Sequence, residues 1–275
     1  AYYDDLTGLP NRPHLIEQTE RTLEYQGHAG GHCALLVLNL DRFKDINDSL
    51  GHANGDWLLQ RVAARLYHRT RPGERLARLG GDEFACLVED LGSHAEAAEV
   101  AQRFLGAFAD PVTVGYHTME VGASVGVSVS PEHGDSAEIL FQHADAALHQ
   151  AKAKGRGHYQ FYTEEMTRAA AQRVQVEAAL REAIDREEVD VYYQPQVELA
   201  TGRIVGAEAL ARWQHAQWGW VSPGQFVPVA EQTGLIHALG RRVLRHVCRR
   251  AAEWQGRGLR RLGLNVSPAQ LEWED

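Results

Sequence analysis

Two kinds of hydrophobic pattern alternate along this chain of 275 residues, and together they predict an alternation of strands and helices. Residues 33–40 are almost wholly apolar without alternation, which is typical of a central strand covered on both faces. Residues 119–129 place Met, Val or Ala at every second position, so we predict a half-buried strand there. Apolar residues at helical spacing predict helices over residues 13–25, 95–108 and 136–154.

A glycine pair, Gly80-Gly81, separates two short strand-like runs and predicts a β-hairpin whose tight turn needs positive φ. Two carboxylates, Asp82 and Glu83, follow the pair directly. Adjacent anions repel, so they are costly unless a cation or several hydrogen-bond donors lie between them. A Mg²⁺ ion shared with substrate phosphates would explain the two carboxylates, and a solvated acidic turn is the simpler alternative. With this hairpin, the order of elements is that of an α+β domain with a mainly antiparallel sheet.

The pattern changes at residue 163, where apolar positions at helical spacing predict one long helix over residues 163–188. Beyond it we predict two strands, two helices and a further strand, over residues 189–195, 204–213, 223–231, 235–255 and 262–267. The chain therefore divides into a first domain, a linker helix and a second domain, over residues 1–163, 164–188 and 189–275.

Further polar groups lie at the ends of the predicted elements of the first domain. Asp56 is expected to begin a helix, and a simple helix cap would account for it. Lys152 and Arg156 lie near the C-terminus of the helix predicted over residues 136–154. The positive charges of these two residues either stabilise the helix through its dipole or bind phosphates.

Composition and charge narrow the class of protein. The length suggests about two domains, and the net charge of −9 argues against a nonspecific nucleic-acid partner. The longest apolar run is far shorter than the roughly 20 residues that cross a bilayer, and no secretory signal opens the chain. Three scattered cysteines are typical of buried residues in a reducing compartment, so we expect a cytoplasmic location. The 14 histidines show no metal-ligand spacing.

The chain begins with Ala rather than Met, and we interpret it as a fragment of a longer protein. If the parent protein is attached to a membrane, we expect the attachment to be through an N-terminal sensor outside the present sequence. No segment of the chain itself is expected to enter a membrane.

The motifs of the first domain together resemble the GGDEF family of diguanylate cyclases, over residues 1 to about 163. The matching motifs, in order, are Asp5-Leu6-Thr7-Gly8-Leu9-Pro10-Asn11-Arg12, Phe43-Lys44-x-x-Asn47-Asp48, Gly51-His52, Gly55-Asp56, Gly80-Gly81-Asp82-Glu83-Phe84 and Lys152-x-x-Gly155-Arg156. The resemblance implies a palm-like ferredoxin-type fold and the reaction 2 GTP → cyclic di-GMP + 2 pyrophosphate. Because each domain has one nucleotide site and the product joins two nucleotides, it also implies a homodimer.

The resemblance further implies roles for individual residues. The metal, Mg²⁺ or Mn²⁺, would be bound by the side chains of Asn39 and Asp82 and by the backbone carbonyl of Leu40, while Glu83 would be the candidate base. The residues implied in GTP binding are Asn47 and Asp56 at the guanine edge, Arg42, Phe43, Lys44, Lys152 and Arg156 at the triphosphate, and His52.

Two positions depart from the family pattern. Asn39 stands where the family usually has Asp, so the metal site loses one negative charge, for which the nearby Asp41 is a possible replacement. The family's product-inhibition motif, R-x-x-D, falls at Arg71-Pro72-Gly73-Glu74, and the longer Glu puts inhibition at Arg71 and Glu74 in question.

The second domain resembles the start of an EAL-type cyclic di-GMP phosphodiesterase, which is a (β/α)₈ barrel. The matching motifs are Tyr193-Gln194-Pro195, Glu208-Ala209-Leu210-x-Arg212-Trp213, Pro223-x-x-Phe226, Ala230-Glu231-x-x-Gly234-Leu235-Ile236 and Asn265-Val266-Ser267. The resemblance implies that Glu208 and Asn265 bind metal, and that cyclic di-GMP is contacted by Gln194, Leu210 and Arg212. The family's later strands are absent from the sequence, so we expect a truncated barrel without hydrolytic activity.

Three functions are compatible with these residues. The chain is either a diguanylate cyclase, or a GTP-binding regulator of the adjacent phosphodiesterase in which Asn39 has disabled catalysis, or a structural dimerisation domain. The intact GTP-binding positions argue against the third function, because a scaffold has no use for a GTP pocket.

Overall fold

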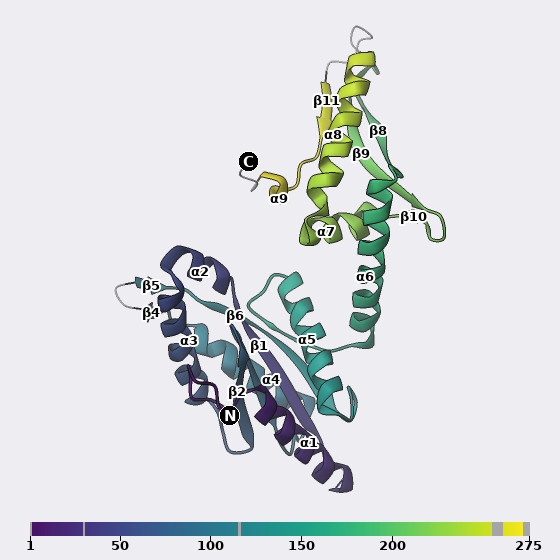
Figure 1. The fold of residues 1–275 in the computed structure, drawn as a ribbon. Helices are drawn as coiled ribbons and strands as arrows, with labels where there is room; N and C mark the ends of the chain where they lie inside the picture. Colours follow the sequence, from purple (N-terminus) through teal and green to yellow (C-terminus); the bar gives the residue numbers. More distant parts are fainter. Residues whose placement is uncertain (1, 30, 115–116, 255–260, 272–275) are drawn as a thin grey trace. The chain divides into compact units, whose positions relative to one another are not determined.

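The computed structural model describes residues 2–29, 31–114, 117–254 and 261–271. Its contacts divide the chain into two units, residues 1–168 and 169–275, and each unit has a hydrophobic core of its own (Figure 1). In the part of the chain that is described, no helix is both long and apolar enough to cross a membrane.

The first unit is built on a five-stranded sheet with the strand order β2-β3-β1-β6-β7 (Figure 1). All pairings in this sheet are antiparallel except that of β6 with β7. The elements are α1 (Arg12–Ala29), β1 (Cys33–Asp41), α2 (Phe43–Leu50), α3 (His52–Tyr67), β2 (Glu74–Gly80), β3 (Glu83–Val88), α4 (His94–Leu105), the 3₁₀ turn η1 (Gly106–Phe108), β4 (Val112–Val114), β5 (His117–Met119), β6 (Gly122–Ser130), α5 (Ala137–Ala153) and β7 (Tyr159–Phe161). The prediction of an α+β domain with a mainly antiparallel sheet is confirmed.

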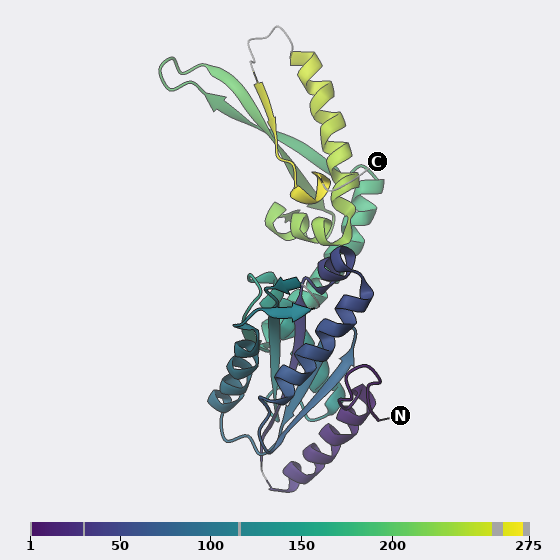
Figure 2. The same cartoon turned by 90° about the vertical axis from the view of Figure 1, so that its left-hand side faces the viewer.

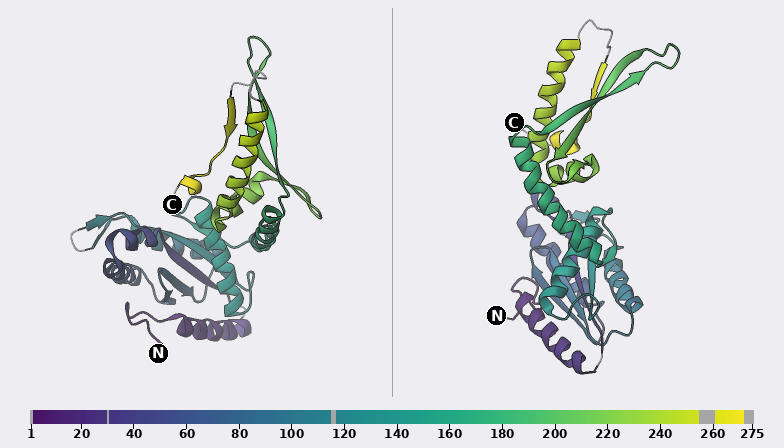
Figure 3. Two further views of the ribbon diagram at one scale, coloured as in Figure 1. Left: turned by 45° about the horizontal axis from the view of Figure 1, so that its top comes forward. Right: turned by 90° about the vertical axis from the view of Figure 1, so that its right-hand side faces the viewer.

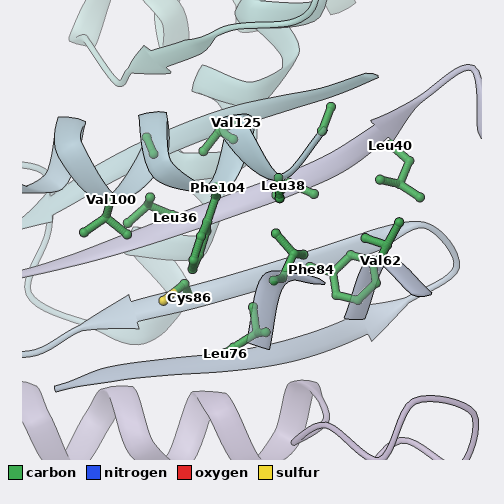
Figure 4. Close-up of a cluster of buried hydrophobic side chains, with 14 of the residues drawn as sticks. Leu36, Leu38, Leu40, Val62, Leu76, Phe84, Cys86, Val100, Phe104 and Val125 are labelled. Carbon is green, nitrogen blue, oxygen red and sulfur yellow. The ribbon is translucent and has the colours of Figure 1, made fainter. Parts of the chain in front are cut away.

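Both faces of this sheet are covered, because β1 sends alternate side chains into two different cores. Leu36, Leu38 and Leu40 pack with α3 and α4 on one face, as Figure 4 shows in close-up. Leu35 and Val37 pack with α1 and α5 on the other face. Figure 2 shows the sheet between its helices. The prediction from the unbroken apolar run is therefore confirmed.

Two local predictions for the first unit need correction, and one helix was not predicted. The unpredicted helix is α2, which has no fully buried residue, although Phe43 and Ile46 on one of its faces pack half-buried against the core. Helix α3 begins at His52, so Asp56 lies in its second turn and is not a helix cap. The strand predicted over residues 119–129 is divided, because β5 ends at Met119 and β6 begins at Gly122. It was also predicted to be half-buried, but β6 is buried on both faces from Ala123 to Ser130, since helices cover both sides of the sheet.

The second unit is an open sheet with helices α6, α7 and α8 packed against it (Figure 3). Its elements are α6 (Glu164–Asp185), β8 (Val189–Val197), β9 (Ile204–His215), β10 (Gly219–Val221), α7 (Pro223–Thr233), α8 (Leu235–Trp254), β11 (Arg261–Leu264) and α9 (Pro268–Leu271). Strand β9 pairs antiparallel with β8 and β10 and parallel with β11. The truncated barrel is not confirmed, since the described strands form no closed barrel. The predicted end of the last long helix at Gln255 lies outside the described residues.

The core of the second unit is centred on Trp213, whose side chain is fully buried. Its indole ring meets the ring of Phe226 edge to face at 5.8 Å. Helix α6 contributes Val176 and Leu180 to this core, while Met166 near its start packs with Tyr162 in the first unit. Cys33 and Cys86 are buried as predicted, but Cys248 is exposed.

Candidate functional site

The hairpin turn brings the two adjacent carboxylates to the end of the central strand. Gly80 and Gly81 have φ of 135° and 51°, which only glycine adopts without strain. The backbone N–H of Leu40 donates to the carbonyl oxygen of Asp82 at 3.2 Å, and Asn39 on β1 pairs with Glu83 on β3. The structure therefore brings together the residues predicted to bind a metal ion, around one edge of the sheet.

A buried arginine that the sequence reasoning missed fixes this turn. Arg78 is 8% exposed, its Nη1 donates to both carboxylate oxygens of Asp4 at 2.9 Å, and its Nη2 donates to the carbonyl of Gly81 at 2.7 Å. Burial opposes ionisation of Asp4, but hydrogen bonds from Thr7 and Arg78 hold its pKa below the ordinary value. The opening motif is thus tied to the glycine pair. A charged residue inside a strand, two positions before a glycine pair, was the available signal.

Glu83 lies in a predominantly acidic environment. Burial, then the carboxylates of Asp145 and Asp82, raise the pKa of Glu83, while Lys152 and Arg12 oppose the rise. The side chain is half-buried and lines a cavity of about 890 Å³ together with Arg12 and Asp145. A carboxyl group with a raised pKa is better matched to accepting a proton near neutral pH.

The start of α2 presents backbone N–H groups beside the end of β1. Arg42, which precedes the helix, has φ of 58°, a left-handed conformation that is uncommon for a residue with a side chain. This turn redirects the chain from the strand into the eight-residue helix, whose first residues are Phe43 and Lys44. A helix N-terminus favours anions such as phosphate. Lys44 is exposed on the first turn, where it adds a positive charge.

Asn47 and Asp56 lie on the adjoining helices α2 and α3. Gly55 makes room for the amide of Asn47, since a Cβ at residue 55 would lie 1.9 Å from Asn47 Oδ1. That oxygen is buried without a hydrogen-bond partner in the described structure. The carboxylate of Asp56 is exposed, as is His52 at the first position of α3. A buried acceptor without a donor is costly, so the site favours a ligand that supplies one.

Lys152 and Arg156 lie at the C-terminal end of α5. Lys152 is half-buried in the last turn of the helix. Its positive charge acts on Glu83 and partly offsets the rise in the pKa of that carboxyl group. Arg156 is exposed and has φ of 61°, between two glycines that also have positive φ. The structure thus places Lys152 on the side of the hairpin turn, and the loop of Arg156 follows directly.

The oxygen atoms at the hairpin suit a hard divalent cation. The side chains of Asn39 and Asp82 and the carbonyl of Leu40 offer only oxygen ligands, which Mg²⁺ and Mn²⁺ prefer. Asn39 is 7% exposed and supplies a neutral oxygen, so Asp82 is the only anionic member of this set. The residues present therefore fit the metal, with one charge less than two carboxylates would provide.

The predicted inhibitory pair is held by other groups of the first unit. The Glu74 side chain is only 6% exposed, forms an ion pair with Arg103, and accepts the backbone N–H of Arg71 at 2.8 Å. The guanidinium of Arg71 donates instead to Glu99 at 3.0 Å. Arg103 was missed by the sequence reasoning, since it lies 29 residues from Glu74 on α4.

A second group of polar residues lies on the sheet of the second unit. Gln194 on β8 is directly opposite Glu208 on β9, and Leu210 and Arg212 continue the same face. Asn265, just after β11, donates from Nδ2 to Glu208 Oε1 at 2.7 Å. A cavity of about 610 Å³ is lined by Leu210, Arg212 and Asn265, among other residues. The five predicted residues therefore share one region.

A histidine cluster that the sequence reasoning missed lies away from both sites. The Nε2 atoms of His94 and His133 lie 2.9 and 3.7 Å from the carboxylate of Glu132. The backbone N–H of Val129 donates to Nδ1 of His133, which leaves the proton of the neutral ring on Nε2. That tautomer favours a hydrogen bond to Glu132 over a bound metal ion.

Comparison with known proteins defines the class. The family model described as "Diguanylate cyclase, GGDEF domain" matches residues 1–158, and that of the EAL domain matches residues 177–275. The chain belongs to the GGDEF family and continues into part of an EAL domain. The families of these two domains generally use divalent metal ions.

Individual relatives share this domain order. The chain is 37% identical over 273 residues to MucR of Pseudomonas aeruginosa, named a bifunctional diguanylate cyclase/cyclic di-GMP phosphodiesterase. It is 39% identical over 273 residues to the cyclic di-GMP phosphodiesterase NbdA of the same organism. Each alignment covers 98% or more of this chain but only 40% of MucR and 35% of NbdA.

Solved structures match the first unit. The GGDEF domain of TpbB (YfiN) from Pseudomonas aeruginosa is 35% identical, with a TM-score of 0.60 over 62% of this chain and 99% of that domain. The coiled coil and GGDEF domain of DgcB from Caulobacter crescentus, solved with cyclic di-GMP, is 25% identical, with a TM-score of 0.54 over 58% of this chain and 85% of that one. The chain is thus a member of the cyclic di-GMP signalling family of GGDEF–EAL proteins.

Proposed function

We propose that the first unit is a diguanylate cyclase domain, which joins two GTP molecules into cyclic di-GMP and releases two pyrophosphates. Two copies would meet as a homodimer, because one domain offers one nucleotide site. The observation that carries this proposal is the buried, unpartnered Oδ1 of Asn47 beside the exposed carboxylate of Asp56. Guanine presents N1–H and an exocyclic amino group along one edge, so it supplies the donors that these acceptors lack. Adenine has no such pair of donors.

The remaining residues suit phosphoryl transfer, which needs positioning and charge neutralisation more than covalent chemistry. The N–H groups at Arg42 and Phe43, with Lys44, Lys152 and Arg156, would hold the triphosphate. Asn39, Leu40 and Asp82 would hold Mg²⁺ or Mn²⁺, which supplies positive charge to the phosphates when bound. Glu83 would accept the proton of the attacking 3′-hydroxyl, in keeping with its raised pKa.

The test is binding and product formation by the chain, and by the longer protein that contains it. We expect Mg²⁺–GTP to bind far more tightly than Mg²⁺–ATP, and cyclic di-GMP to accumulate in chromatography of the products. Asn47→Ala should weaken GTP binding by about tenfold, the cost of a hydrogen bond to a buried group. Ser49→Ala, an exposed change on the same helix, is the matched control. Equal affinity for GTP and ATP would contradict the proposal.

A GTP-binding regulator is the second candidate, favoured by the contacts of Asp41. Its two carboxylate oxygens accept hydrogen bonds from Ser124 Oγ at 2.9 Å and from the N–H of Gly157 at 3.3 Å. Asp41 is therefore engaged elsewhere and is a poor replacement for the charge missing at Asn39. In this candidate the domain binds GTP, makes no product, and controls the EAL domain beside it.

We infer that product inhibition through Arg71 and Glu74 is weak. The Glu74 carboxylate would have to leave Arg103 before it could contact cyclic di-GMP. For the second unit, we infer that Glu208 and Asn265 bind metal and that Gln194, Leu210 and Arg212 contact cyclic di-GMP. Leu210, Arg212 and Asn265 line one cavity, while Glu208 accepts a hydrogen bond from Asn265 and pairs with Gln194 across the strands. This proximity supports the inference, and hydrolysis is proposed only for the longer protein.

A further inference from the structure

The loop that carries Arg156 has an unusual backbone. Gly155, Arg156 and Gly157 have φ of 120°, 61° and 70° in succession. Arginine in the left-handed region is disfavoured, and strained residues of this kind persist only where surrounding contacts hold them. The backbone N–H of Arg156 donates to the carbonyl of Ala151 at 3.1 Å, and the carbonyl oxygen of Arg156 lies 2.9 Å from Nδ1 of His158. The contacts that tie the loop to the sheet are made by the next residue, Gly157.

Those contacts come from the ends of two central strands. The N–H of Gly157 donates to both Asp41 Oδ2, at 3.3 Å, and Ser124 Oγ, at 3.2 Å. Ser124 Oγ in turn donates to Asp41 Oδ1 at 2.9 Å. Ser124 is fully buried on β6, where it pairs with Asn39 of β1. The three residues form a closed triangle of hydrogen bonds.

We propose that Asp41 and Ser124 are positioning residues that clamp the loop of Arg156 beside the metal-binding end of β1. The clamp joins the strand bearing Asn39 to the loop bearing the proposed phosphate-binding cation, so one set of bonds connects two elements that are proposed to hold the triphosphate. This inference rests on the proposed GTP site. It assigns Asp41 to the loop rather than to the metal ion.

The alternative roles predict different behaviour. If Asp41 were the replacement for a carboxylate at Asn39, only Asp41 variants would weaken metal binding, because Ser124 is not a proposed ligand. If Ser124 merely stabilised the core, its loss would lower stability without affecting nucleotide affinity. The clamp instead predicts that loss of either side chain weakens phosphate binding through Arg156.

The experiment compares Ser124→Ala and Asp41→Asn with the unchanged chain. The probe is 3′-deoxy-GTP with Mg²⁺, which lacks the 3′-hydroxyl needed for the reaction, and its affinity is measured by titration calorimetry. We expect about a fivefold loss of affinity in each variant, the usual cost of one hydrogen bond, with unchanged Mg²⁺ dependence. Hydrogen exchange at the Gly157 amide should be faster in both.

Ser128→Ala is the matched control. Ser128 is fully buried on the same face of the same strand, but its hydroxyl donates to the carbonyl of Leu140 in α5, at 2.8 Å. Its loss should leave affinity for the probe unchanged. In an Arg156→Ala background, Ser124→Ala should cause no further loss of affinity, because residues that act through one another are not additive.

The outcomes separate the clamp from the proposed function. If the unchanged chain does not bind 3′-deoxy-GTP, both the proposed GTP site and the clamp's role in it are wrong. Normal binding by the unchanged chain, with unaltered affinity in both variants, overturns the clamp alone. A change in Mg²⁺ dependence confined to Asp41→Asn would return Asp41 to the metal site.

Discussion

Helices cover both faces of the sheet in the first unit, whereas in the second unit the described helices pack mainly against one face. On β9, Ala209 and Trp213 enter the core, while Glu208, Leu210 and Arg212 point to the opposite face. The candidate residues of the first unit lie instead at strand ends, in turns and on helices α2, α3 and α5, outside the two cores. The same alternation of strand residues is therefore buried on both faces in the first unit and mainly on one face in the second.

The largest expected effects come from two substitutions close together in the first unit, one in the proposed site and one in the core. Asp82→Ala should lower the proposed cyclase activity by on the order of 100-fold or more, since it removes the only anionic member of the proposed metal site, at little cost in stability. Phe84→Ala should lower the free energy of unfolding by about 3–5 kcal/mol, because its ring is buried in the core. Product assays and urea unfolding measure the two. Comparable destabilisation by both changes would make Asp82 structural.

Trp213→Ala tests whether the second core is separate. Loss of this fully buried ring should cost about 3–5 kcal/mol in the second unit. Hydrogen exchange should show lost protection in β8, β9 and α8, with α1 to β7 unchanged. GTP affinity serves as the control for the first unit. Simultaneous loss of protection in both units would show that they unfold together.

Limited proteolysis should reveal the difference in coverage directly. We expect the residues after 189 to be digested and a resistant fragment to remain that ends between residues 162 and 186, because the second sheet has a partly uncovered face and open edges. Mass spectrometry of the fragments identifies the cleavage sites. Equal resistance in both units would mean that the second core is more stable than its coverage suggests.

Asn39→Asp should have a moderate effect on the first unit. A second carboxylate would add one negative charge to the metal site and raise its affinity for Mg²⁺. The Mg²⁺ concentration for half-maximal activity should therefore fall, by roughly several-fold. Activity measured across a Mg²⁺ titration gives this value. An unchanged midpoint would show that another group already supplies the charge, and would weaken the case for a regulator without activity.

The smallest effect concerns Glu83, measured without divalent metal. Its raised pKa means that the folded state disfavours the ionised form, so this residue costs stability as the pH rises through its titration range. Glu83→Gln should therefore raise the melting temperature at neutral pH, and the difference should vanish in acid, where Glu83 is protonated. Melting curves across pH give the result, and a lower melting temperature at neutral pH would contradict it.

The sequence by itself determined the order of the elements and the position of the hairpin turn. The unbroken apolar run of residues 33–40 records burial on both faces directly, and the glycine pair marks positive φ. The alternating run of residues 123–129 predicted the strand but not its burial, because Ser124, Gly126 and Ser128 are covered as well. The motifs likewise located the candidate residues of both domains. Local patterns suffice here because each reports the surroundings of its own residues.

Only the tertiary structure decided the half-buried packing of the short helix α2 and the contacts that span long stretches of sequence. Arg78 meets Asp4 across 74 residues, and Asp41 meets Gly157 across 116. Such pairs depend on which strands are neighbours and on their register, and a single side chain carries no record of either. The sequence therefore named the residues of the site, while the packing of β1, β3 and β6 determined what holds them in place.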